Sequence, residues 1–509
     1  MSLDAALLAA RSGLLHTQRA LAAAANDVAN AETAGHTNKT VAARAVQVDG
    51  QGIGVRTLVP TRDVDEALVA ELDRSRAASA AAALREELLQ GIETAHGNPA
   101  EGNGLGDIVA MLRAGFEDLR ASPAEPGRQA ALVIEAEALA VRFNQVAAAI
   151  GAARQQAQDG IVTEVALING TLREIAALTG QIRGQIALQG SAAALEDQRD
   201  AAIARLSESI EVRALKRADG GIVLVGRNGM VLPLDPVRDA FATADAIIGP
   251  AAFHGAGGTL PGIMMGGQDV TGLIKGGRLA EYVALRDATL PRYQAEVDLA
   301  AAHLAARLDA QGLALFTDAA GAVPDVTQPY AASAMLGFAG AMRVNGAVAA
   351  NPALLRDGTH DVTGNPLGAA DSTTNPPGGP ASFIALLDRV IDFAFGTEAQ
   401  AGTPWGGIPT AGLGPDGTLA SPFGAPPTLE GYAGLLTAVH TADRATASAQ
   451  ADAADSLRQG LEARFAQRSG VDVDAEMAAM VTLQNAYAAN ARIMSTVQAM
   501  WDALLGAVR

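Results

Sequence analysis

The chain has 509 residues, enough for about three domains, and it carries 37 basic against 55 acidic side chains, a net charge of −18. This acidic balance argues against nucleic acid or an anionic membrane as the main partner, and the absence of cysteine excludes disulfides, thiol nucleophiles and cysteine metal sites. Aromatic residues are only 4% and alanine supplies much of the hydrophobic content, so we expect alanine-rich helices with narrow apolar seams.

The first 30 residues predict a helix with one apolar seam. Ser2 can cap this helix, and Asn30 and Gly35 mark its end. Because Asp4 and Arg11 interrupt the apolar residues, we expect no secretory signal peptide, and no run of about 18 uncharged apolar residues predicts a transmembrane helix. The seam steps by four and three, as in a coiled coil, through Leu3, Leu7, Ala10, Leu14, Thr17, Leu21, Ala24 and Val28.

Two shorter helices are predicted next. A short extended piece at 52–55 precedes a helix that opens at 62–66. Asp107 is expected to cap a further helix, which Ser122 and Pro123 end.

The longest helices are predicted at 128–188 and 278–310. The seam of the first breaks its heptad at Gly160, which leaves two possibilities: one long helix or two nearly collinear ones. In the second, Pro291 either kinks the helix or marks its true start.

A β region is predicted between these long helices. Residues 211–217 and 222–225 flank a Gly-rich turn and indicate a meander of short antiparallel strands. Further on, 382–394 has a helical period, and 396–427, with few charges and many turn residues, is expected to be an irregular surface excursion. Helix returns at about Leu429 and continues, with an interruption at Ser469 and Gly470, to the end of the sequence.

The last helix repeats the seam of the first. The two seams suit one structure closed by both ends of the chain, or two segments that bind partner subunits, and the pattern alone does not choose between them. Either interpretation predicts an assembling protein. The positions are Met480, Gln484, Tyr487, Ala491, Met494, Gln498, Trp501, Leu505 and Val508.

No motif predicts catalysis or a cofactor. None of the seven histidines has metal-ligand spacing to another, and the Gly-rich pieces at 50–54 and 102–106 lack the endings of phosphate loops. A nucleophile elbow Gly-x-Ser-x-Gly is also missing. We therefore expect no enzyme activity, no cofactor and no metal; a helical enzyme or binding module with its site in 313–430 is the alternative from another class.

Both termini carry a recognisable signature. Residues 26–37, Asn-Asp-Val-Ala-Asn-Ala-Glu-Thr-Ala-Gly-His-Thr, resemble the Asn-Asn-Ile-Ala-Asn-x-x-Thr-x-Gly-Tyr signature of flagellar rod, hook and hook-associated proteins. Residues 469–477 and 483–492 resemble the C-terminal signature of the same proteins. His36 stands where tyrosine is usual and Ala34 where proline is common, so we expect His36 to be a packing substitute and not a ligand.

The middle of the chain resembles one family more specifically, that of flagellar hook-associated protein 1 (the FlgK family). The matching stretches are Asp-Gln-Arg-Asp at 197–200 with Leu-Ser at 206–207, Gly-Gly-Arg-Leu at 276–279, Leu-Arg-Asp at 285–287, Val-Asn at 344–345 and Asn-Pro at 351–352. The stretch before Val344 is short where many members insert an outer β domain, so that domain is expected to be reduced or missing.

The resemblance implies a mainly α fold with a smaller β part, elongated and nested. The expected domains are 1–34 plus 472–509, a terminal coiled-coil polymerisation domain; 35–208 plus 276–312 plus 341–471, a helical bundle; and 209–275 plus 313–340, a small β region.

The resemblance also implies a role: a structural component outside the cell, at the junction between flagellar hook and filament, exported without a cleaved signal peptide. Implied partners are other copies in a helical ring, the hook protein, the second junction protein next to the filament, and an export chaperone at the C-terminal helix. A hook or distal-rod protein is the alternative. The expected assembly interface is Leu3, Leu7, Leu14, Leu21, Val28, Asn30, Gly35, Met480, Leu483, Gln484, Tyr487, Ala491, Met494, Trp501 and Leu505.

Overall fold

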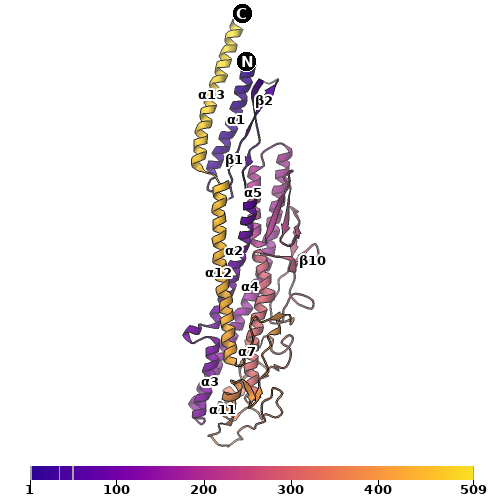
Figure 1. Cartoon of the computed structure of the whole chain (residues 1–509). Helices are drawn as coiled ribbons and strands as arrows, with labels where there is room; N and C mark the ends of the chain where they lie inside the picture. The colour runs from indigo at the N-terminus through magenta and orange to yellow at the C-terminus, as the bar shows by residue number, and fades with distance from the viewer. Residues whose placement is uncertain (1–2, 34, 49–50, 508–509) are drawn as a thin grey trace.

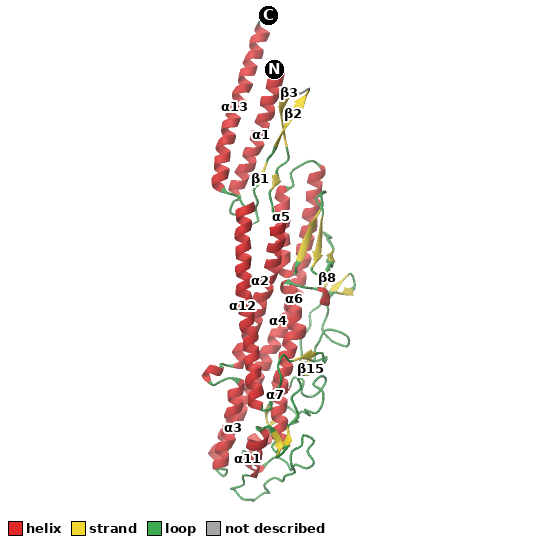
Figure 2. Ribbon diagram, viewed as in Figure 1, coloured by secondary structure: helices red, strands yellow, loops and turns green. Residues whose placement is uncertain are grey.

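A computed structural model describes residues 3–33, 35–48 and 51–507. The molecule is a long, thin stack of helices with both termini at the same end, as Figure 1 shows. Helix dominates and the strands are short (Figure 2), so the predicted mainly α class with a smaller β part is confirmed. The cap predicted at Ser2 and the seam step predicted at Val508 lie outside the described residues.

Long helices that run along the molecule make the body. The central one, α4, is a single helix of 62 residues, which settles the question raised by the heptad break at Gly160. The ring of Tyr282 lies where a side chain at position 160 would stand, so the break makes room for a neighbouring helix. The body consists of α2 (Glu66–His96), α3 (Leu105–Ala121), α4 (Pro126–Ala187), α5 (Ala193–Ser209), α6 (Gly277–Ala284), α7 (Leu290–Ala310) and α12 (Leu429–Ser469).

Two details of these helices differ from or refine the prediction. Asp107 is not the N-cap of α3: the helix begins earlier, because fully buried Leu105 draws the first turn into the core, and Asp107 accepts a hydrogen bond from the N–H of the true N-cap, Gly104. Pro291 lies in the first turn of α7, directly after a π-helical turn at 285–289. Since proline has no N–H to donate, the backbone widens there instead of breaking.

The predicted β meander is confirmed. Strands β5 (Val212–Lys216), β6 (Ile222–Gly226) and β7 (Val231–Leu232) pair antiparallel in sequence order. Their inner side chains join residues of α4 and α5 in a second, smaller apolar cluster. A further small sheet contains β8 (Phe241–Ala242), β9 (Met264–Met265) and β10 (Gln268–Asp269).

Residues 311–428 wrap the end of the molecule that is far from the termini (Figure 1). The helix predicted at 382–394 is present as α11 with a following π-helical turn at 390–394. The stretch 396–427 is not purely a surface excursion, since Ile408 and Leu413 are buried. The elements here are β11 (Phe316–Thr317), α8 (Phe338–Ala341), β12 (Arg343–Val344), α9 (Gly346–Ala350), α10 (Leu354–Asp357), α11 (Ala385–Arg389), β13 (Glu398–Gln400), β14 (Thr403–Pro404), β15 (Ala411–Leu413) and β16 (Leu419–Ala420).

The clusters of buried apolar side chains lie in the body. Its largest cluster combines α2, α3, α4, α7, α12 and the wrapped segment. A third, small cluster of Leu68, Leu72 and Leu461 lies toward the terminal end. Among the described residues, the buried clusters contain none from α1 or α13.

Candidate assembly site

The two ends of the chain form an antiparallel pair of helices that projects from the body (Figure 1). These are α1 (Leu3–Ala29) and α13 (Val473–Gly506), which we call the terminal hairpin. All eight seam positions predicted on α1 are buried or half-buried, and the buried ones are the small residues Ala10, Thr17 and Ala24. At Gly13 the helices come so close that an added Cβ would lie 2.9 Å from Nδ2 of Asn490. The contact is therefore a thin seam of small side chains.

On α13 the predicted seam is only partly in phase. The predicted positions Met480, Ala491, Met494 and Trp501 are half-buried, and the covered face also includes Leu483, Ala486, Asn490 and Val497. Gln484, Gln498 and Leu505, placed in the seam by steps of four and then three, are exposed, and Tyr487 is 38% exposed. The predicted positions differ from the covered ones because apolar or small residues also stand next to the predicted positions, as Leu483 stands next to Gln484. Whether these residues contact other subunits stays a prediction.

A second set of apolar side chains on the terminal hairpin faces outward. Nothing in the single chain covers them to the degree seen in the body, although each is large enough to stabilise a contact by about 1.5–3 kcal/mol if buried. The set is Leu8 and Leu15 on α1 and Met477, Val481, Ile493, Met500, Leu504 and Leu505 on α13, all at least 46% exposed.

A β ribbon lies along α1. Strands β2 (Ala43–Val48) and β3 (Gln51–Thr57) pair antiparallel, and β1 (Lys39–Thr40) pairs with β4 (Thr61–Arg62) at the base of the ribbon. Ser12 Oγ on α1 accepts a hydrogen bond from the N–H of Val55 at 3.0 Å. Gly54 has a φ of +143° and a side chain there would strike Ser12, so the close approach requires glycine.

The turn after α1 is built around Asp27. This carboxylate is fully buried and accepts hydrogen bonds from the N–H of Lys39 at 2.8 Å and from Nε2 of His36 at 2.9 Å. Asn30 closes the turn through Nδ2, which donates to the carbonyl of Asn26. Gly35 adopts a φ of +80°, which favours glycine. His36 thus acts as a hydrogen-bonding partner of Asp27, which differs from the packing role expected for it.

Asp197 on α5 receives this turn and joins it to the body. It accepts hydrogen bonds from Thr37 Oγ1 at 2.7 Å, from Lys39 Nζ at 2.7 Å and from Arg62 at 2.9 Å. Burial raises the pKa of Asp197, but the bonds from Lys39, Thr37 and Arg62 outweigh it, so the pKa lies below its usual value. The carboxylate is therefore charged at neutral pH and joins three backbone segments.

Three further contacts complete this polar joint, which we define as Asp27, His36–Lys39, Arg62, Asp197, Asp200 and Glu476. Arg62 also pairs with Asp200 at 2.5 Å, and these carboxylates raise its pKa despite the opposing effect of burial. On the other side, Asn38 donates from its side chain to Glu476 Oε1 at 2.6 Å and from its backbone to the carbonyl of Ser469. The joint therefore holds α1, α13, α5 and the end of α12 with hydrogen bonds and ion pairs.

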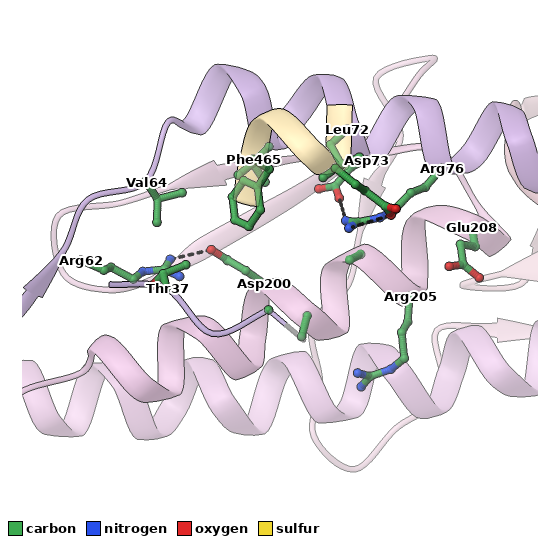
Figure 3. A pocket seen from close by; sticks show the side chains of 15 residues that line it. Thr37, Arg62, Val64, Leu72, Asp73, Arg76, Asp200, Arg205, Glu208 and Phe465 are labelled. Atoms are coloured by element: carbon green, nitrogen blue, oxygen red, sulfur yellow. Dashed lines mark hydrogen bonds and ion pairs between the residues drawn. The ribbon is translucent and has the colours of Figure 1, made fainter. Parts of the chain in front are cut away.

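A cavity of about 400 Å³ lies beside the joint (Figure 3). Val64, Leu72 and Phe465 line it on one side and Arg62 with Asp200 on the other. Burial raises the pKa of Asp73, at its edge, to about 6, although Arg76 at 3.1 Å partly offsets this. A second cavity of about 260 Å³ lies between the turn and α5, so the connecting segment at 35–37 is not packed tightly on either side.

Comparisons with known proteins point to one family. The model of the FlgK helical domain, described as that of a flagellar hook-associated protein, matches residues 89–321. The model of the C-terminal region of the flagellar basal body rod FlgEFG proteins matches residues 463–507. These two matches support the FlgK family. This is a family of flagellar structural proteins, and among the described residues no helix is long and apolar enough to cross a membrane.

The other comparisons add little to this. A solved structure, the flagellar hook junction protein FlgK from Burkholderia pseudomallei, aligns at 21% identity with a TM-score of 0.41. That alignment covers 50% of this chain and 45% of the other, so it spans less than half of the solved chain. No curated protein matches the chain.

The FlgK-like stretches of the middle have structural positions that explain their residue types. Arg199 is buried and donates to the carbonyl of Gly220 at 2.7 Å, which anchors the β meander to α5. Gly277 has a φ of +74° and its Cα lies against the backbone of Ser209. Arg278 pairs with Glu164 at 2.6 Å. Asn345 caps α9 by accepting from the N–H of Ala347.

Sequence reasoning missed several residues of the joint. Thr37, Lys39 and Arg62 were not singled out as site residues, although all three contact Asp197. The signal available in the sequence was a cation at each end of the ribbon, Lys39 and Arg62, together with a stretch at 197–200 that contains two aspartates. Within the described residues, no group of three or more histidine or acidic side chains has the arrangement of a metal site.

Proposed function

We propose that this chain forms the junction between the flagellar hook and the filament outside the cell. The terminal hairpin is the polymerisation element: its outward apolar residues contact neighbouring copies in a helical ring, the hook protein on one side and the second junction protein on the other. The observation that carries the proposal is the terminal hairpin itself, a helix pair with a thin seam and a large exposed apolar surface.

The physical argument concerns the free subunit. An isolated pair of long helices with few buried large side chains gains little to offset the entropy of ordering. Contacts with neighbouring copies would bury Leu8, Val481, Ile493 and Met500 and supply the missing free energy. Such head-to-tail contacts propagate as a helical array and do not close into a dimer. An export chaperone that binds α13 would cover the same residues before assembly.

The proposed domain division follows the same logic, with one change. The terminal domain is proposed as α1 with α13, and the β2–β3 ribbon joins it because this ribbon contacts α1. The helical bundle and the small β region keep the predicted parts of the chain.

The alternative, a hook or distal-rod protein, is favoured only by the C-terminal match, since that model describes rod proteins. The helical-domain match over 89–321 favours the junction role instead.

The test is deletion of the gene in the source organism, with imaging of the cell surface and assay of flagellin in the medium. The proposal expects bare hooks and leaked flagellin. Loss of hooks as well would support the rod or hook alternative, and normal filaments would contradict both.

Complementation with variants then tests the terminal hairpin. Ile493→Glu with Met500→Glu places two charges on its exposed face without touching the body. The matched control is Ile134→Glu with Val141→Glu, an equally spaced and somewhat more exposed pair on α4. We expect the control to restore filaments and the α13 variant to be exported but to leave bare hooks. Filaments restored by both would contradict the assembly role of this face.

A further inference from the structure

A buried chain of hydrogen bonds crosses three helices of the body, far from the joint. Glu296 on α7 is fully buried, and its Oε2 lies 2.8 Å from Nε2 of His440 on α12. Nδ1 of His440 lies 2.8 Å from Nε2 of His96, the last residue of α2. Both histidines are almost completely buried.

The hydrogen-bonded series Glu296, His440 and His96 has only one protonation state that leaves no buried donor unpaired. Glu296 is an acceptor, so His440 must carry its proton on Nε2, and its bare Nδ1 must then accept from the Nε2–H of His96. Nδ1 of His96 is left as a bare acceptor, buried and without a hydrogen-bond partner. Both imidazoles are therefore neutral when the chain is intact.

An added proton on either histidine leaves a buried N–H of His96 without an acceptor. If His96 takes it, the new N–H on Nδ1 is a buried donor with no acceptor. If His440 takes it, both of its nitrogens donate, His96 must change tautomer, and the same orphan N–H appears on His96. A buried donor without a partner is destabilising, and a buried cation must be accommodated as well.

The surrounding charges do not relieve this cost. On the His96 side, Arg142 from α4 donates to the carbonyl of Ala95, and its charge opposes protonation of His96. Glu93 of α2 and Glu101 lie on the open side of this region; Glu93 is already paired with Arg444 of α12 at 3.3 Å.

On the His440 side, the carboxylate of Glu296 is already shared. Oε1 accepts from Arg292 at 3.2 Å and from Ser421 Oγ at 2.7 Å. Tyr293 stacks on the imidazole of His440 at 3.7 Å, and its hydroxyl donates to Asp443. Burial lowers the pKa of His440, and the Glu296 bond offsets this only in part.

We propose that the chain of Glu296, His440 and His96 is an acid-labile lock, which holds the end of α2 and the first turns of α12 on α7 at neutral pH and releases them when the medium is acidified. This goes beyond the proposed junction function and does not depend on it. The lock contributes its full stabilisation at pH values above the ordinary pKa of histidine. As pH falls below it, the opened state binds protons that the closed state cannot, so opening is favoured.

The size of the effect follows from the histidine pKa. Burial lowers the pKa of His96 from 6.5 to about 3. This one group then makes the opening constant roughly 25-fold larger at pH 5 than at pH 7. His440 adds to the effect in the same direction.

The experiment is hydrogen exchange on the full chain at pH 7 and pH 5, corrected for intrinsic exchange rates, over 89–96 and 432–444. We expect an increase of roughly 25-fold or more in the wild type and a much smaller one in His96→Gln, whose amide can still donate to His440 but does not titrate. His360→Gln, at an exposed histidine, is the matched control and should behave as wild type. An equal increase in His96→Gln and wild type would overturn the proposal.

Nitrogen NMR of the imidazoles in the wild type keeps the proposal testable if His96→Gln does not fold. The lock requires both histidines to remain neutral, with the proton on Nε2, down to the pH at which these segments open. If His96 or His440 becomes charged while residues 89–96 and 432–444 stay protected from hydrogen exchange, the proposal is refuted.

Discussion

The terminal hairpin and the body are built from similar alanine-rich helices, yet they differ in what fills the space between them. In the body, Phe116, Leu139 and Phe143 belong to the largest apolar cluster and are at most 1% exposed. In the terminal hairpin the buried side chains are Ala10, Thr17, Ala24, Asp27 and Val497, and the large side chains are half-buried or face outward. The difference teaches that helix length alone does not determine stability here; the number of large side chains that each helix can bury does.

The largest expected effect is in the body. Phe143→Ala removes a ring from the centre of the core and should lower the free energy of unfolding by about 3–5 kcal/mol, measured by urea denaturation with circular dichroism. Leu14→Ala, in the half-buried seam of α1, should leave this main transition unchanged. Comparable shifts from both variants would mean that the two regions unfold as one unit.

A second prediction concerns the polar contacts of the body. Arg154 is fully buried and donates to the carbonyls of Gly249, Ala252 and Arg286. Arg154→Met leaves these acceptors unpaired and should destabilise the body by about 2–3 kcal/mol, with faster hydrogen exchange around 249–252. Arg183→Met, at an exposed arginine on the same helix, is the control and should have little effect.

The joint should respond to charge and not to core packing. Asp197→Asn keeps a hydrogen-bond acceptor for Thr37 but removes the partner charge of Lys39 and Arg62, so we expect a loss of about 1–2 kcal/mol, confined to the joint and the terminal hairpin. The readout is hydrogen exchange at 37–39 relative to α4. Unchanged exchange at 37–39, or an equal change in the exposed-pair control Asp239→Asn, would argue against the joint.

The joint should also weaken in acid. Because the folded pKa of Asp197 lies below its usual value, its contribution is complete above the unfolded value of about 4 and is lost as the pH falls through the lower folded value. Exchange at 37–39 should therefore rise below about pH 4 in the wild type and depend less on pH in Asp197→Asn.

The smallest effect on the free chain is expected at the exposed residues of α13. Leu505→Ser should change the stability of the free chain by less than about 0.5 kcal/mol, since the side chain is 59% exposed. A loss of filaments in cells that carry this variant would show that the residue serves assembly. A clear destabilisation of the purified chain would instead place Leu505 in an intramolecular contact.

The sequence predicted the long helices and the meander because their apolar residues repeat over many turns. The seam of α1 was predicted at every position, although Leu8 and Leu15 stand beside Leu7 and Leu14. On α13 only part of the seam was predicted, because Leu483 and Gln484 both fit the spacing and the close approach at Gly13 and Asn490 selects between them. The joint was harder still: Thr37, Arg62 and Asp197 are separated by up to 160 residues, and no periodicity connects them.

The most direct test of the contrast between the two regions is hydrogen exchange of the full-length free chain at neutral pH, followed by mass spectrometry. The account predicts that α1 and α13 exchange within seconds to minutes while α4 and α7 remain protected for hours. Protection of α1 and α13 equal to that of α4 would contradict it, because the terminal hairpin would then be stable without the neighbours that it is proposed to bind.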